Sequence, residues 1–120
     1  MAVEQIDGQL YAHMIQGGAA RLRLNEQEIN GLNVFPIPDG DTGSNMRLTI
    51  DNGVTALSSE EITSVSHPAQ LAAKGMLMGA RGNSGVILSQ LFAGMGRELS
   101  DCETASVHKL NLFTSHIVTP

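Results

Sequence analysis

The amino-acid sequence predicts an all-α fold, and two observations support this prediction. Apolar residues recur at three- and four-residue intervals through most of the first 99 positions, which is the spacing of one helix face. No segment before residue 100 shows the alternation of apolar and polar residues that is typical of a half-buried strand. Glycine and proline interrupt the periodicity at several points, so we expect separate helices joined by loops.

The first helix is expected from about residue 7 to residue 23. Its apolar face repeats at helical spacing and consists of Ile6, Leu10, Met14, Tyr11 and Ile15. Asn25 and Glu28 have the spacing of a capping box, in which each side chain bonds a free backbone N–H at a helix start. The sequence therefore predicts a second, short helix that begins there and ends near Leu32.

The next helix follows a loop. Pro36 and Pro38 exclude both a helix and a central strand, so residues 33–43 are expected to be irregular. Thr42 or Ser44 can cap the helix that comes after them. The expected apolar face of this helix is formed by Met46, Ile50, Val54 and Leu57.

Two further helices are expected, with a glycine-rich loop over residues 79–85 between them. Proline suits a first helical position, so one helix should begin at Pro68. Its predicted apolar face consists of Leu71, Gly75 and Met78. The predicted face of the last helix consists of Leu88, Phe92, Met95 and Leu99, and Ile87 and Leu91 adjoin it. Residues 100–120 show no sustained period, and no structure is predicted for this tail.

The composition excludes several classes of protein. A chain of 120 residues forms one domain at most. Its net charge of −5 and its scattered basic residues argue against a nucleic-acid or anionic-membrane partner, and 3% aromatic residues cannot form a base-stacking platform. No apolar run approaches the ~20 residues that a membrane span requires. A lone Cys102 and the lack of a signal-peptide pattern predict a cytoplasmic protein.

The loop before residue 42 has the composition of a metal and phosphate site. Asp39 and Asp41 stand one residue apart, and carboxylates together with phosphate oxygens are typical ligands of Mg²⁺. Asn33 would add a carbonyl oxygen if the loop folds back. The backbone N–H groups at the following helix start would face an anion, which makes candidates of Thr42, Gly43, Ser44 and Asn45.

The second glycine-rich loop repeats the phosphate-binding half of this design. Glycines such as Gly82 and Gly85 allow a backbone to approach a ligand closely, while Ser84 offers a hydroxyl and Arg81 a positive charge. Met46 is either a core residue or a contact to a purine ring. Each loop alone is compatible with an ordinary turn or helix cap, but two such loops that each lead into a helix favour a nucleotide with a metal ion.

Three other phosphate and metal motifs fit the sequence less well. A Walker-type loop requires lysine, and neither loop contains one. An EF-hand that begins at Asp39 requires glycine and glutamate where Ser44 and Ile50 stand. An aspartate-nucleophile phosphatase requires threonine where Gly43 stands.

Residues 30–46, Asn-Gly-Leu-Asn-Val-Phe-Pro-Ile-Pro-Asp-Gly-Asp-Thr-Gly-Ser-Asn-Met, resemble the signature of a nucleotide-binding domain that two kinases share. One is dihydroxyacetone kinase, in its ADP-binding subunit, and the other is bacterial fatty-acid kinase, in its ATP-binding subunit. Residues 79–90 resemble the second loop of this family. Both segments are more similar to the fatty-acid kinase branch, and the resemblance covers about residues 5–97.

The resemblance implies an antiparallel eight-helix barrel that holds two magnesium ions and ATP or ADP at one rim. Asp39 and Asp41 would be magnesium ligands, with Asn33 as the candidate third. The implied nucleotide contacts are Thr42, Gly43, Ser44, Asn45 and Met46 in the first loop, and Gly82, Asn83, Ser84 and Gly85 in the second. The metal ions and the phosphate clamp would perform catalysis by positioning and charge neutralisation. A separate fatty-acid-binding or dihydroxyacetone-binding subunit would present the acceptor.

The sequence departs from the family pattern after about Arg97, and it lacks the family's later Pro-x-Glu-Gly-Thr motif. We therefore expect residues 1–99 to form about the first half of the barrel and residues 100–120 to be a divergent tail, as in a truncated or frame-shifted product. Helix faces without their neighbours would favour self-association. Three functions stay open: a kinase module of the fatty-acid type, a dihydroxyacetone kinase nucleotide subunit, and a nucleotide-binding fragment without catalytic activity.

Overall fold

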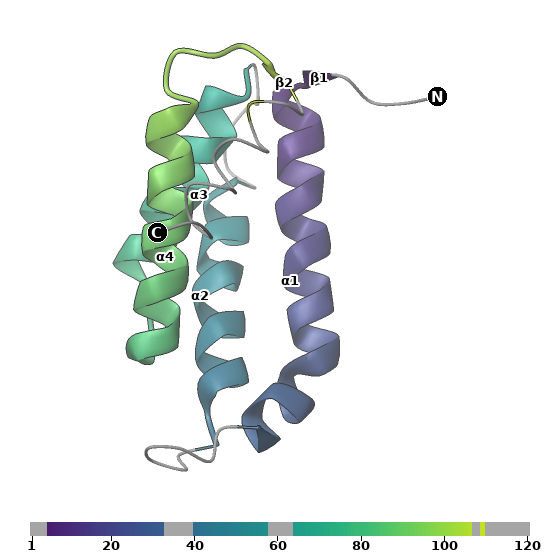
Figure 1. Ribbon diagram of the computed structural model, residues 1–120, viewed down its shortest axis with the longest axis vertical. Helices are drawn as coiled ribbons and strands as arrows, with labels where there is room; N and C mark the ends of the chain where they lie inside the picture. The colour runs from purple at the N-terminus through teal and green to yellow at the C-terminus, as the bar shows by residue number, and fades with distance from the viewer. Residues whose placement is uncertain (1–4, 33–39, 58–63, 107–108, 110–120) are drawn as a thin grey trace.

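The computed structural model describes residues 5–32, 40–57, 64–106 and 109. This part of the chain forms four helices and one short antiparallel strand pair (Figure 1). The elements in chain order are β1 (Gln5–Ile6), α1 (Gly8–Gly31), α2 (Thr42–Leu57), α3 (Ser66–Met78), α4 (Gly82–Glu98) and β2 (Ala105–Ser106). The predicted all-α class is confirmed, and the packing of the helices is consistent with part of a helical barrel.

Consecutive helices run in opposite directions along the long axis of the molecule (Figure 1). Helix α2 packs against α1, α3 and α4. Because α2 and α4 are separated by one antiparallel helix, they run parallel to each other and begin at the same end. The described residues directly before these two helices, 40–41 and 80–81, are therefore at one end of the fold.

Small residues let the backbones of α2 and α3 approach closely. Ala69 and Ala72 of α3 are fully buried, and so is Met76. A Cβ atom added at Gly75 would lie 2.7 Å from the carbonyl oxygen of Asn52 in α2, which only glycine avoids. Larger apolar side chains fill the remaining core, including Tyr11, Ile15, Ile50, Leu57 and Leu99.

Helix α1 is continuous, so the predicted break at Asn25 is wrong. The side-chain amide of Asn25 donates a hydrogen bond to the carbonyl of Arg21 at 2.8 Å, one turn earlier. This bond satisfies the asparagine inside the helix, and the backbone continues to Gly31. Asp7 caps the start of α1, because its Oδ1 accepts a hydrogen bond from the N–H of Leu10 at 2.8 Å.

The expected start and inward face of α3 also need correction. The helix begins at Ser66, two residues before Pro68. Met78 is 81% exposed and Met76 is fully buried, because the close approach to α2 turns the alanine-rich face inward. Gly75 and Leu71 of the predicted face are half-buried.

The apolar faces of the other helices are confirmed in part. Ile50 and Leu57 of α2 and Leu99 after α4 are buried, as predicted. The remaining members of the predicted faces on α2 and α4, namely Met46, Val54, Leu88, Phe92 and Met95, are half-buried. Met14 and Ile87, which also belong to or adjoin the predicted faces, are 50% and 69% exposed.

The strand pair connects the two ends of the described chain. Gln5 pairs with Ser106 and Ile6 with Ala105. The segment before β2 also contacts the start of α3, where the N–H of Val65 donates to the carbonyl of Glu103 at 2.8 Å. The division into a barrel part and a tail at residue 99 stays a prediction. None of the described helices has the length and apolar character needed to cross a membrane.

Candidate functional site

The starts of α2 and α4, which follow the two predicted loops, lie side by side. The hydroxyl of Ser84, in the first turn of α4, donates to the carbonyl of Thr42, the first residue of α2, at 3.2 Å. The backbone N–H of Arg81 donates to Thr49 Oγ1 at 3.1 Å, and that hydroxyl donates to the carbonyl of Asn45 at 2.8 Å. These bonds fix the starts of α2 and α4 against each other.

At the contact between the two helix starts, Gly82 occupies a position where a side chain would be strained. Its φ angle is +66°, a left-handed conformation that favours glycine. A Cβ atom at this position would also overlap the side-chain amide of Asn45. The glycine therefore allows the α4 start to bend and to lie directly on α2.

The paired helix starts form a favourable environment for an anion. The first N–H groups of a helix have no acceptor within the helix, and the helix dipole places partial positive charge there. Helices α2 and α4 are parallel and begin at the same end, so the free N–H groups and partial positive charges of both starts lie together. Asp41, Gly82 and Asn83 are exposed at this end, whereas Thr42 and Asn45 are half-buried.

Ser44 faces α1 and is fully engaged there. Its hydroxyl donates to Glu26 Oε2 at 2.6 Å and accepts from Asn30 Nδ2 at 3.0 Å. Its backbone N–H donates to Asn30 Oδ1 at 3.1 Å. The structure thus places this residue of the motif against a polar pair on the preceding helix.

A chain of charges extends from the same contact along α1 and α2. Arg47 donates to Glu26 Oε1 at 2.7 Å and pairs with Asp51 at 3.3 Å, and Arg23 pairs with Asp51 at 3.1 Å. The hydrogen bonds from Ser44 and Arg47 lower the pKa of Glu26. The hydrogen bond to Glu26 in turn raises the pKa of Arg47. Glu26 is therefore held as a carboxylate beside the α2 start.

Only part of the predicted metal site can be placed. Asn33 and Asp39 lie outside the described residues. Asp41 is exposed directly before α2, and its carbonyl accepts from the N–H of Asn45 at 2.9 Å. In the ranges that the structure describes, no group of three His, Cys, Asp or Glu residues is close enough to hold a metal ion. The roles of the three predicted ligands stay predictions.

A small apolar cleft adjoins the paired helix starts. It has a volume of about 230 Å³ and is lined by Met46, Ser84, Ile87, Leu88 and Leu91. Ser84 lines the cleft and also donates a hydrogen bond to the first residue of α2, so the cleft lies beside the paired helix starts.

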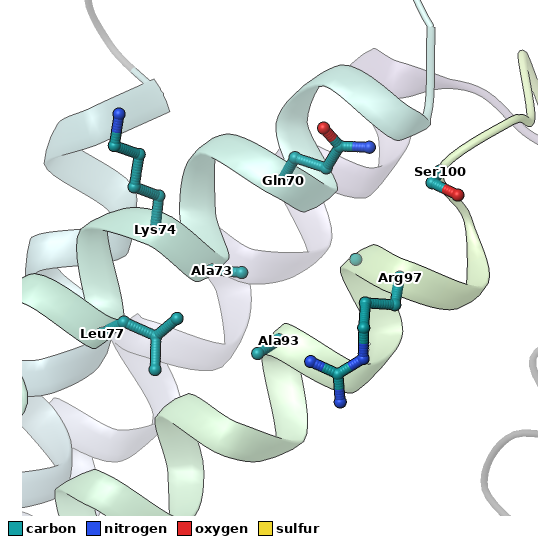
Figure 2. A pocket seen from close by; sticks show the side chains of 8 residues that line it. Gln70, Ala73, Lys74, Leu77, Ala93, Arg97 and Ser100 are labelled. Carbon is teal, nitrogen blue, oxygen red and sulfur yellow. The ribbon is translucent and has the colours of Figure 1, made fainter.

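A larger groove of about 340 Å³ lies elsewhere, between α3 and α4 (Figure 2). Small side chains such as Ala73 and Ala93 form its floor, and Lys74 and Arg97 project from the two flanking helices. None of its lining residues belongs to the two loop motifs. Size alone therefore does not identify the candidate site, which is defined by the convergent loops.

Sequence reasoning missed the polar residues that hold the loops in place. Glu26 and Asn30 stand four residues apart, which puts them on one face of a helix that ends beside the first loop. That spacing places the two side chains on one helix face, but it does not indicate that this face meets the start of α2. Thr49 lies between Leu48 and Ile50, and only its complete burial distinguishes it from a surface threonine.

Comparison with known proteins defines the class of protein. A DAK2 domain, which is the domain of the dihydroxyacetone kinase L-subunit family, matches residues 36–118. The match includes residues 36–43 of the first loop, the whole second loop, and all of α2, α3 and α4. The chain therefore belongs to the DAK2 domain family.

Several bacterial relatives are similar over most of this chain. An uncharacterized protein of Staphylococcus saprophyticus is 48% identical over 102 residues, which is 85% of this chain and 18% of the relative. Protein YloV of Bacillus subtilis is 44% identical over 99 residues, or 82% of this chain and 18% of the relative. An uncharacterized protein of Staphylococcus aureus is 45% identical over 97 residues, which is 81% of this chain and 18% of the relative. The chain thus spans about a fifth of the length of these relatives.

Proposed function

We propose that this chain is the magnesium-nucleotide-binding part of a dihydroxyacetone-kinase-like phosphotransferase. The observation that supports this proposal most strongly is the convergence of two parallel helix starts, joined by the Ser84–Thr42 and Arg81–Thr49 hydrogen bonds. Membership of the DAK2 domain family supports the same class of function.

The phosphates of ATP or ADP would lie across the two helix starts. Backbone N–H groups of Thr42 and Gly43 on α2, and of Gly82, Asn83 and Ser84 on α4, would approach the phosphate chain from two sides. Asn45 and Gly85 support this arrangement, because the Asn45 side chain lies against Gly82 and Gly85 is buried near Thr49. The two aligned helix dipoles would stabilise the negative charge.

Magnesium would complete the site. Mg²⁺ in phosphate-binding proteins uses one or two carboxylates together with phosphate oxygens and water. Asp41, exposed directly before α2, fits this donor set. We propose that Asp39 and Asn33 are the other metal ligands and that the site holds two magnesium ions. When bound, the metal would neutralise charge on the transferring phosphoryl group. This chain's own contribution is to orient the phosphates.

The apolar cleft beside the helix starts is the proposed place for the adenine ring. Met46 and Leu88 line it, and the flat faces of an aromatic ring are stabilised when they move from water to such an apolar surface, while the polar ring edge stays accessible. Ser84 would lie between the base and the phosphates, since it contacts both regions.

The acceptor is proposed from resemblance. Both loop segments are more similar to the fatty-acid kinase branch, so we propose an acyl group presented by a separate fatty-acid-binding protein. A dihydroxyacetone-binding partner is the alternative. Nucleotide binding without phosphoryl transfer is the third possibility. A phosphoryl-transfer assay with each type of partner distinguishes the three.

Self-association is a further part of the proposal. Exposed apolar side chains include Leu24 at 80%, Leu32 at 74% and Ile87 at 69%. Such side chains gain from burial against a second copy or a partner. Light scattering at increasing protein concentration tests this, and a concentration-independent monomer contradicts it.

The central test is calorimetric titration of ATP and ADP with and without magnesium. We expect the wild type to bind only with magnesium, and Asp41→Asn to weaken binding about tenfold or more, because hydrogen bonds and ionic contacts to charged groups contribute about 1.5–3 kcal/mol. Asp101→Asn is the matched control, since Asp101 is exposed after α4 and outside both loops. Binding that is independent of magnesium, or equal in the Asp41 variant, contradicts the proposal.

A further inference from the structure

Glu26 and Asn30 lie one helical turn apart on α1 and face the first turn of α2. Together they engage the three polar groups of Ser44 that a ligand would otherwise meet: the hydroxyl hydrogen, a hydroxyl lone pair and the backbone N–H. The corresponding distances are 2.6 Å to Glu26 Oε2, 3.0 Å to Asn30 Nδ2 and 3.1 Å to Asn30 Oδ1.

The contact extends beyond this serine. A Cβ atom added at Gly43 would lie 2.6 Å from the carbonyl oxygen of Glu26 and 3.0 Å from Asn30 Oδ1. The backbone of α2 therefore rests on the last turns of α1. Arg47, one turn further along α2, donates to the second oxygen of Glu26 at 2.7 Å. One carboxylate thus holds two successive turns of the helix that begins at the phosphate site.

We propose that Glu26 and Asn30 are positioning residues for nucleotide binding, and that Ser44 transmits their effect and does not itself contact the phosphates. This inference rests on the proposed function. It differs from the role that the motif resemblance implies for Ser44, because the groups that would bind phosphate are already paired with α1. The ligand then meets α2 through the N–H groups of Thr42 and Gly43.

The physical basis is the direction of the backbone N–H groups. A helix start binds an anion only when its free N–H groups point to one place, and that place must match the one set by α4. The Ser84–Thr42 bond fixes α2 on the side of α4, and the Ser44 contacts fix it on the side of α1. Loss of either support lets the first turn of α2 move, and part of the binding energy is then used to order it.

A double-mutant cycle on magnesium-dependent ADP affinity tests the inference, with Glu26→Ala, Ser44→Ala and the double variant. If Ser44 acts through Glu26, each single variant weakens binding by about fivefold to tenfold, and the double variant is no weaker than the worse single one. Ser44→Thr, which keeps the hydroxyl, restores the wild-type affinity. Arg23→Ala, which breaks the exposed Arg23–Asp51 pair on the same two helices, leaves the affinity unchanged.

Multiplied effects in the double variant overturn the inference, because they show that Ser44 contacts the ligand independently of Glu26. Single variants with wild-type affinity overturn it as well. Should Glu26→Ala fail to fold by circular dichroism, Glu26→Gln takes its place in the cycle. A folded wild type that binds neither ATP nor ADP overturns the proposed function and this inference with it. If only the inference fails, the wild type still binds magnesium-nucleotide, so the two failures are distinguishable.

Discussion

The hydroxyl of Thr49 accepts a hydrogen bond from the backbone N–H of Arg81 at 3.1 Å, which ties the residue before α4 to the middle of α2. Thr49 is fully buried, so no water competes for this bond. The same hydroxyl donates to the carbonyl of Asn45 at 2.8 Å. One side chain therefore joins the residue before α4 to α2, in addition to the Ser84–Thr42 bond.

Thr49→Val should destabilise the fold by about 1–3 kcal/mol, because valine keeps the shape of threonine but leaves the Arg81 N–H without its acceptor. Chemical denaturation of both proteins measures the change. Thr55→Val is the control: Thr55 is exposed and donates to the carbonyl of Asp51 in the same helix at 2.9 Å. An equal effect of the two substitutions would contradict the role assigned to Thr49.

Gly82→Ala should destabilise the protein by about 1–3 kcal/mol, because alanine at a φ of +66° is strained and its Cβ overlaps Asn45. Gly17→Ala should have the opposite effect and stabilise the protein by about 0.5–1 kcal/mol. Gly17 lies inside α1 with no atom within 4 Å of an added Cβ, and alanine is the better helix former. Thermal unfolding of the two variants checks both signs, and a neutral Gly82→Ala would count against the close contact.

Acid should weaken the fold through Glu26. Its pKa is lowered in the folded state by Ser44 and Arg47, so the stabilisation is present above the unfolded value of about 4.3 and is lost as pH falls through the lower folded pKa. Glu26→Gln should therefore lose less stability than the wild type between about pH 5 and pH 2. Urea denaturation across that range measures the difference, with Glu98→Gln, an exposed site at the end of α4, as the control.

Alkali should weaken the fold through Tyr11. Its side chain is buried and its hydroxyl donates to Met95 Sδ at 3.0 Å, and burial raises its pKa. The stabilisation is complete below the unfolded pKa of about 10 and decreases by up to about 1.4 kcal/mol per pH unit above it. Tyr11→Phe should lack this loss in alkaline denaturation curves. Because Tyr11 is the single tyrosine, phenolate absorbance also reports its titration directly, and ionisation near pH 10 in the folded protein would refute the effect.

Much of the helical structure was predictable because its signals are local. The apolar repeats at Ile50 and Leu57 predicted a helix in the right place, and both side chains are buried. The errors arise where a residue has two ways to satisfy its polar groups. Asn25 has the spacing of a cap, but it bonds the carbonyl of Arg21 and stays inside the helix.

Tertiary packing explains the remaining errors in the fold. The inward face of α3 is set by how closely α2 approaches, and that distance depends on glycine and alanine residues of both helices. Met76 and Met78 have the same apolar character, yet the first is buried and the second is 81% exposed. Single-sequence periodicity has no information about such a rotation.

The candidate site was predictable as two loops but not as a set of contacts. Glycine and polar residues before each helix indicated the loops, and their convergence follows from the antiparallel order of the helices. The partners of Ser44 lie 14 and 18 residues earlier in the chain, on a helix whose own sequence gives no reason to face this loop. Such pairings depend on the three-dimensional arrangement.

The strand pair at the far end of the bundle has a consequence for the time course of folding. Thr104 Oγ1 donates to Gln5 Oε1 at 2.9 Å across a separation of 99 residues, whereas neighbouring helices meet across short connections. Closure of a longer loop requires a greater loss of chain entropy, and contacts of high sequence separation slow folding. The helical hairpins should form first, and the pairing of Ile6 with Ala105 should be the last step to gain protection from hydrogen exchange.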